Sequence, residues 1–227
     1  MISLPRLKLS GVGLAAIAAF VALAYWGYLT YSKTQLQKAV IELVKDTSDR
    51  LQAGFAADAG TASTDRTVSK LDDLAQEVDK HIIELNRLSA SRNRPLVDAA
   101  EEYLLTARQI LRSQAASKRY RAQVAASERA LRDHMQGANR RSRAWIDEAM
   151  RMKDRLERDY FDYRTSAEAL GRLLESLPGA RKRLASHVGA APLADEAAIG
   201  KARQRALEES RRVAGEVERA RQLAAVR

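Results

Sequence analysis

Hydrophobic and polar positions divide the chain into one apolar segment near its start and a long amphipathic remainder. Residues 9–31 carry no charge, and a helix of about 20 apolar residues is enough to cross the ~30 Å hydrocarbon core of a bilayer. Beyond this segment, hydrophobic residues recur every three or four positions, the spacing typical of amphipathic helices. The pattern therefore predicts an all-α protein: a single N-terminal transmembrane helix followed by an elongated helical bundle or coiled coil.

Glycine, proline and short polar runs indicate where these helices should end. The expected breaks lie at Gly60, at Arg94, around residues 137–139, at Pro178 and at Pro192. Proline interrupts a helix because it lacks a backbone N–H and its ring collides with the preceding turn, and glycine weakens a helix by ~1 kcal/mol relative to alanine. We expect the segments nearest the membrane to pack up-down-up and the last segment to return antiparallel along the one before it.

These breaks suggest four parts along the chain. Residues 1–8 form a short basic tail and residues 9–31 the transmembrane anchor. Residues 32–177 form the elongated helical bundle or coiled coil, and residues 178–227 a basic helical return. No segment recurs at a fixed period, so the architecture is not predicted to be a repeat array.

The most regular hydrophobic seam runs from Leu131 to Leu177, with spacings that alternate between four and three. Such a seam buries its apolar positions only against another helix, so it predicts a partner-binding surface. Its candidate contact residues are Trp145, Met152, Leu156, Tyr160, Tyr163, Leu170 and Leu174. A second copy of the chain or a different protein could supply the partner helix.

Basic and aromatic residues flank the apolar segment as they do in membrane anchors. The predicted membrane-interface residues are Arg6, Lys8, Tyr25, Trp26, Tyr28 and Tyr31. The alternative is a signal peptide cleaved after the small-residue sequence at 22–24. The apolar run continues past this sequence into the aromatic residues, which favours a retained anchor. The short basic tail favours an N-terminus inside the cell, with the body of an inner (cytoplasmic) membrane protein on the periplasmic side.

Charge and cysteine content narrow the partners and the chemistry. The chain has 39 Lys and Arg against 29 Asp and Glu, a formal net charge of +10, and no cysteine. Without cysteine it has no disulfide framework, thiolate metal site or cysteine nucleophile. Part of the basic excess forms a candidate patch for anions or acidic partners, made of Arg140, Arg141, Arg143, Arg181, Lys182 and Arg183. Nucleic acid is not favoured, because no recognition motif accompanies these clusters.

No motif predicts catalysis, and we expect no catalytic, metal-binding or cofactor-binding residues. The histidines His81, His134 and His187 lie in separate segments, and His81 is expected on a helix surface. Asp159 and Asp162 share a helix face, where flanking arginines favour a salt-bridged, solvated surface over acid–base chemistry.

The function predicted from the sequence is that of a non-enzymatic scaffold or interaction protein of the cell envelope, anchored in the membrane by one helix. The seams contain many Ala, Ser and Thr residues, and such thin seams favour burial against a second copy or a protein partner. The alternative is a ligand-binding sensory bundle that acts through a partner protein. The two differ in whether the helices enclose a ligand pocket.

Overall fold

The described part of the chain folds into five α-helices and no strand, which confirms the all-α prediction. The computed structural model describes residues 11–60, 63–88, 93–137 and 142–225; within 11–32 it describes the side chains of Tyr25 and Tyr31 alone, and for 223–225 only the backbone. The helices are α1 (Gly11–Ala59), α2 (Thr64–Leu88), α3 (Arg94–Gln136), α4 (Arg143–Val188) and α5 (Glu196–Ala225).

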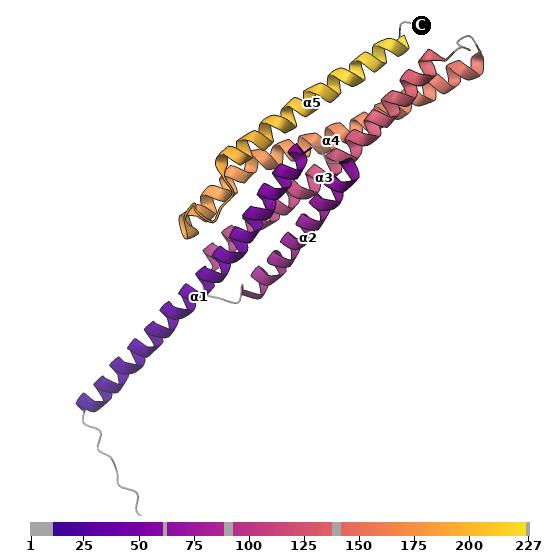
Figure 1. Ribbon diagram of the computed structural model, residues 1–227. Coiled ribbons are helices and arrows are strands. Elements are labelled where there is room, and N and C mark those ends of the chain that lie inside the picture. The colour runs from indigo at the N-terminus through magenta and orange to yellow at the C-terminus, as the bar shows by residue number, and fades with distance from the viewer. Residues whose placement is uncertain (1–10, 61–62, 89–92, 138–141, 226–227) are drawn as a thin grey trace, which may run out of the picture.

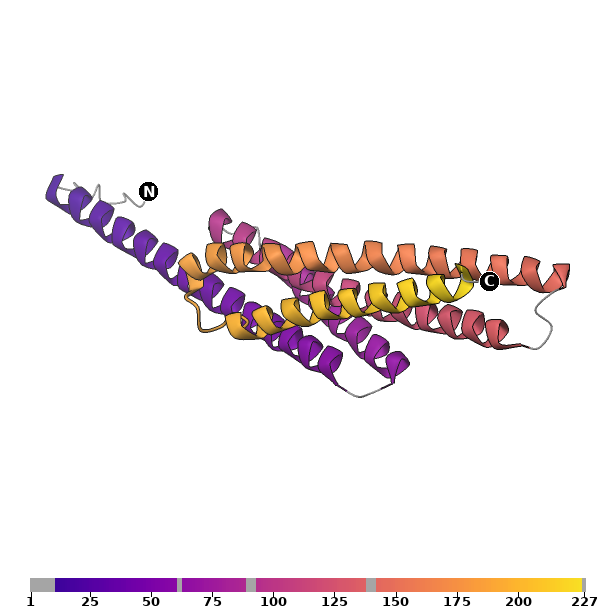
Figure 2. The same cartoon turned by 90° about the horizontal axis from the view of Figure 1, so that it is seen from above.

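The helices form a rod whose two ends are built differently (Figure 1). The first part of α1 leaves the rod at one end, and the hairpin of α3 and α4 forms the other, distal end. Figure 2 shows that α5 runs beside α4 and ends before the hairpin does. Ion pairs set this antiparallel register: Arg203 lies 2.6 Å from Glu175, and Arg221 pairs further along with Glu157. The distal turns of the hairpin therefore have no α5 beside them.

Two hydrophobic clusters hold the rod together. The proximal cluster joins all five helices; its buried members include Leu51, Leu71, Tyr103, Leu104, Leu174 and Ile199. The distal cluster joins only α3, α4 and α5; its buried members include Val124, Leu131, Leu156, Tyr163, Val213 and Val217. The up-down-up packing of α1, α2 and α3 and the antiparallel return of α5 are both confirmed. The number of packed helices thus falls along the rod, from five to three and then to two.

Most helix ends lie where the local signals predicted them. Pro95 occupies the first turn of α3, where the missing N–H costs no intrahelical bond. Gly137 follows the last residue of α3, and Gly189 ends α4 with a left-handed φ of 80°. Glycine adopts this conformation without the steric cost that other residues carry.

The break expected at Pro178 is wrong, because α4 continues through it to Val188. The expected boundary between residues 177 and 178 therefore falls inside a helix. Leu177 and Leu184 are both fully buried, on either side of the proline. Burial of this face offsets the one backbone hydrogen bond that proline removes.

The first part of α1 extends beyond the bundle (Figure 1), and its first described buried side chain is Leu36. Across the side chains that the structure describes, no helix holds a stretch apolar and long enough to span a bilayer. The predicted anchor at 9–31 falls almost wholly outside those side chains, as do its residues Arg6, Lys8, Trp26 and Tyr28. The anchor therefore stays a prediction.

Candidate interaction surface on the distal hairpin

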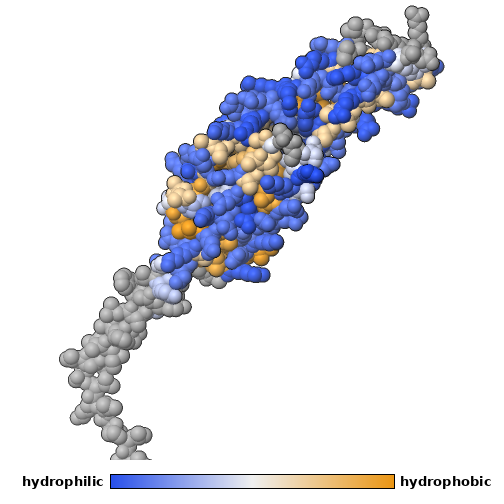
Figure 3. Space-filling model, viewed as in Figure 1, coloured by the Kyte–Doolittle hydropathy of each residue, from blue (hydrophilic) through white to orange (hydrophobic). Residues whose placement is uncertain are grey.

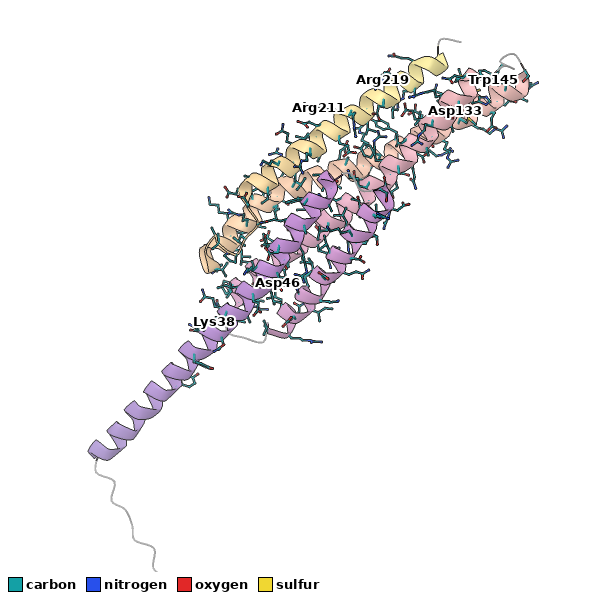
Figure 4. The ribbon with its side chains drawn as sticks, viewed as in Figure 1. Lys38, Asp46, Asp133, Trp145, Arg211 and Arg219 are labelled. Atoms are coloured by element: carbon teal, nitrogen blue, oxygen red, sulfur yellow. The ribbon has the colours of Figure 1, made fainter. Side chains whose placement is uncertain are left out.

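At the loop end of the α3–α4 hairpin, His134 and Trp145 make a reciprocal contact. Their rings stack with centroids 4.9 Å apart and planes 15° from parallel. The indole Nε1 donates to the backbone oxygen of His134 over 3.2 Å, and the histidine Nε2 lies 2.9 Å from the backbone oxygen of Trp145. Ser142 caps α4 by accepting a bond from the Trp145 amide. Figure 4 shows Trp145 and Asp133 together at this end of the rod.

The predicted partner-binding seam of α4 is occupied within the chain itself. Leu156, Tyr163, Leu170 and Leu174 are buried in the two clusters. The remaining seam residues are partly buried against the distal cluster; they are Trp145, Met152 and Tyr160. Because α3 and α5 supply the helices that this seam needs, its four buried side chains are not offered to another protein.

The predicted basic patch is not one surface. Arg143 begins the 46-residue helix α4, whereas Arg181, Lys182 and Arg183 lie near its far end; Arg140 and Arg141 lie outside the described residues.

Two of the described arginines in this predicted patch also have intramolecular partners. Arg181 donates to the Ala194 backbone oxygen over 2.9 Å and pairs with Glu196, and Arg183 pairs with Glu102. Clusters along the sequence thus do not map onto a single anion site.

An open groove between α3 and α4, which we call the distal groove, escaped the sequence prediction. Its volume is about 540 Å³. Helix α3 lines it with Ala126, Ser127 and Ala130, and α4 with Glu148, Arg151, Met152, Asp154, Arg155 and Arg158. Small side chains on α3 and long charged ones on α4 give it a shallow floor and a raised, mainly basic rim. No sequence motif marks it, because it depends on the register between two helices.

The rim arginines of the distal groove are accessible to a partner. The Arg151 side chain is 72 % exposed and lies 3.2 Å from Glu148 on its own helix. The Arg155 side chain is 73 % exposed and lies 3.9 Å from Asp159. Arg158 forms no ion pair within the part of the chain that the structure describes. Exposed pairs of this kind contribute at most ~1 kcal/mol, so they can exchange for a partner's carboxylates.

Another flank of α4 presents large hydrophobic residues to solvent. Ile146, Met150 and Phe161 are 47 %, 62 % and 67 % exposed. Figure 3 shows hydrophobic side chains between the hydrophilic ones along the rod. Exposed apolar side chains that gather on one helix face are a common feature of protein-binding surfaces.

A buried polar junction ties α1 to its neighbours, and it corrects the surface position expected for His81. The His81 Nδ1 lies 2.9 Å from the Thr47 hydroxyl, and both side chains are buried. The Ser48 hydroxyl lies 2.9 Å from that of Tyr103, which accepts a bond of 3.1 Å from the Ala194 amide. Burial lowers the pKa of His81 and raises the pKa of Tyr103.

A second junction holds the C-terminal end of α1. The Lys118 ammonium lies 3.0 Å from the Asp58 carboxylate and 3.4 Å from that of Glu209. Burial alone would lower the pKa of Lys118, but the two carboxylates outweigh burial and raise it. Arg205 of α5 also donates to the Phe55 backbone oxygen over 3.3 Å. Side chains of α3 and α5 thus fix the end of α1.

No protein family model, curated protein or solved structure matches this chain. Within the described ranges, no three acidic or histidine side chains converge as metal ligands would.

Proposed function

We propose that this protein is a non-enzymatic scaffold, anchored in the membrane by α1, that holds an interaction surface away from the bilayer. The observation that carries the proposal is α1 itself, one continuous 49-residue helix. Its second half packs in the bundle, and its first half extends beyond it (Figure 1). That first half holds the uncharged segment 9–31 from residue 11 onward. An apolar helix without protein neighbours is stabilised by lipid, because water solvates its side chains poorly.

The dimensions of the free part of α1 agree with this role. Residues 11–35 precede the first described buried side chain of the helix. At 1.5 Å per residue they extend ~37 Å, against a hydrocarbon core of ~30 Å. The helix would therefore cross the membrane and enter the bundle without a hinge.

The polar junctions support a scaffold because they couple the anchor helix to the whole rod. Helix α1 is bonded to α2 through His81, to α3 through Tyr103 and Lys118, and to α5 through Arg205. A helix held at several points along its length transmits the orientation of its membrane segment to the body. The distal hairpin would then stand far from the bilayer.

We place the body outside the cytoplasm, with the anchor retained in the inner membrane. Arg6 and Lys8 on a short tail support an N-terminus inside the cell. The sensory-bundle alternative would need an interior ligand cavity. The small cavity beside Lys118 has a volume of about 20 Å³, room for about one water molecule. The larger distal groove is open to solvent, which favours a surface that binds another protein.

Alkaline extraction of membranes tests the anchor. The full chain should stay in the membrane pellet, because a transmembrane helix is not released when peripheral contacts are broken. The variant Ala18→Arg/Ala22→Arg places two charges in the apolar segment, at a cost of roughly 3 kcal/mol each, and should move to the supernatant. Lys33→Ala/Lys38→Ala, outside the segment, is the control. Release of the unaltered protein, or loss of its first 24 residues, would contradict the proposal.

Reporter fusions at Arg227 test the orientation. A reporter that is active only after export should be active, and one that is active only in the cytoplasm should be silent. The reverse pattern would refute the extracytoplasmic placement and leave the anchor itself intact.

A further inference from the structure

Helix α2 covers one face of α3, which we call the lane of α2. The distal groove lies on the continuation of this face beyond α2. Helix α2 packs antiparallel to α3, with Asp79 2.8 Å from Arg108 and Asp72 paired with Arg119. It begins at Thr64, eight residues before Asp72 and beside Ala122, and no described helix occupies the lane beyond it. The α2-facing side of α3 then continues as an exposed surface, because residues three and four positions apart share a helix face.

Three exposed small residues lie on this continued face, beside the longer side chains of Gln123, Arg129 and Asp133. Ala122, Ala126 and Ala130 succeed one another at one-turn intervals along α3. Ala122 lines an open hollow of about 540 Å³ beside the start of α2, and the next two alanines line the distal groove. The two hollows thus follow one another along one side of α3. Alanine side chains leave room for a second helix to approach closely.

The charges around the lane indicate the chemistry of the helix that would fill it. In the occupied part, arginines of α3 meet aspartates of α2. In the open part, Arg151, Arg155 and Arg158 form the rim, and Glu148 and Asp154 offset them only partly. The net charge of the chain is +10, so a second copy would be repelled where an acidic helix is attracted.

We propose that the distal groove binds an acidic amphipathic helix of a partner protein, which extends the lane of α2 and packs against α3 and α4. Its apolar side lies on the alanine face and Met152, and its carboxylates replace the weak intrahelical partners of the rim arginines. This inference rests on the proposed scaffold function and names the class of partner that the scaffold holds.

A synthetic peptide tests the inference on the full chain in lipid nanodiscs. The probe is a fluorescently labelled helix with Leu and Ala on one face and Glu on both flanks. A peptide of the same composition, scrambled so that it has no apolar face, is the control for charge alone. A third peptide replaces each Glu by Lys. The acidic amphipathic peptide should bind saturably, and the other two should bind at least ~10-fold more weakly, the loss expected when the charge or the packing is wrong.

Matched variants locate the binding site. Arg155→Glu/Arg158→Glu should weaken binding by ~10-fold or more, because it reverses the rim charge. Arg211→Glu/Arg219→Glu makes the same charge change on the exposed side of α5 (Figure 4) and should alter binding by less than ~2-fold. Ala126→Gln, at an exposed floor position, should also weaken binding without disturbing the core. Circular dichroism checks that each variant keeps its helix content.

The outcomes separate this inference from the scaffold proposal. Equal binding of the scrambled peptide, equal losses in the two arginine variants, or no binding of the acidic helix would overturn the groove assignment while the anchor experiments stand. If the protein self-associates and Arg155→Glu/Arg158→Glu abolishes this self-association, the groove binds a second copy of the chain, which would overturn the assignment of an acidic partner. Release of the protein from the bilayer would instead contradict the scaffold.

Discussion

At the scale of single residues, Gly54 sets how closely α1 approaches α3. A Cβ built on Gly54 overlaps the Cδ2 methyl of Leu111 and lies 3.4 Å from that of Leu71. Both leucines are fully buried, so an added Cβ would force the Leu111 side chain to shift within the core. The glycine is therefore required by packing, although a glycine weakens a helix interior by ~1 kcal/mol.

Gly54→Ala should destabilise the fold by about 1–3 kcal/mol, the usual cost of overpacking a core. Gly215→Ala is the matched control, because a Cβ there meets nothing within 4 Å. It should stabilise α5 by up to ~1 kcal/mol. Chemical denaturation of the detergent-solubilised chain measures both changes. A stabilising effect at Gly54 would contradict the close approach of the two helices.

His81 predicts a loss of stability in mild acid. Burial lowers its folded-state pKa below the ordinary value of 6.5, and Arg50 adds to this, whereas Asp46, Glu84 and Glu77 act in the opposite direction. The unfolded chain then binds the proton first as the pH falls. The stabilisation is complete above about pH 6.5 and declines as the pH falls from there towards the lower folded-state pKa.

The measurement is the melting temperature between about pH 7.5 and about pH 5. Steps of ~0.5 pH unit are sufficient, because a single group titrates over about two pH units. The unaltered protein should lose melting temperature on acidification, and His81→Leu should lose less. An identical pH dependence in both proteins would show that His81 is not the group responsible.

At the scale of elements, Tyr103 joins three parts of the fold by one hydroxyl. It bonds to Ser48 of α1 and accepts from the amide of Ala194, in the turn between α4 and α5. Tyr103→Phe should cost about 1–3 kcal/mol, because the buried amide of Ala194 loses its acceptor. Tyr160→Phe is the control, since that hydroxyl has no hydrogen bond within the described residues. Amide exchange at Ala194 should quicken only in the first variant.

Helix ends were predictable from the sequence because their signals are local. Gly60, Pro95 and Gly137 act on their own turn of the backbone, and each lies at or beside an end. The prediction at Pro178 was wrong because the effect of this proline is decided by the buried leucines on either side of it.

The polar junctions could not be predicted from the sequence either. A period of three to four shows that His81 and Thr47 lie on helices, but not that the two helices meet through them.

At the scale of the whole molecule, the elongated helical form was predictable and the surface was not. The seam of α4 shows in the sequence that a partner helix is needed, but not that α3 and α5 of the same chain supply it. The distal groove exists because the α3–α4 hairpin extends beyond the start of α2 and beyond the end of α5. Which residues stay uncovered depends on the registers of three helix pairs, and no short motif encodes a register.

If the protein is a membrane-anchored rod, its distal hairpin stands away from the bilayer, and energy transfer to the membrane surface measures this distance. The chain has no cysteine, so a donor can be placed at a single Lys38→Cys or Asp133→Cys, near opposite ends of the rod (Figure 4). Acceptors are lipid headgroup dyes in nanodiscs that hold the full chain. We expect strong transfer from position 38 and little from position 133. Equally strong transfer from both, or none from position 38, would contradict this arrangement.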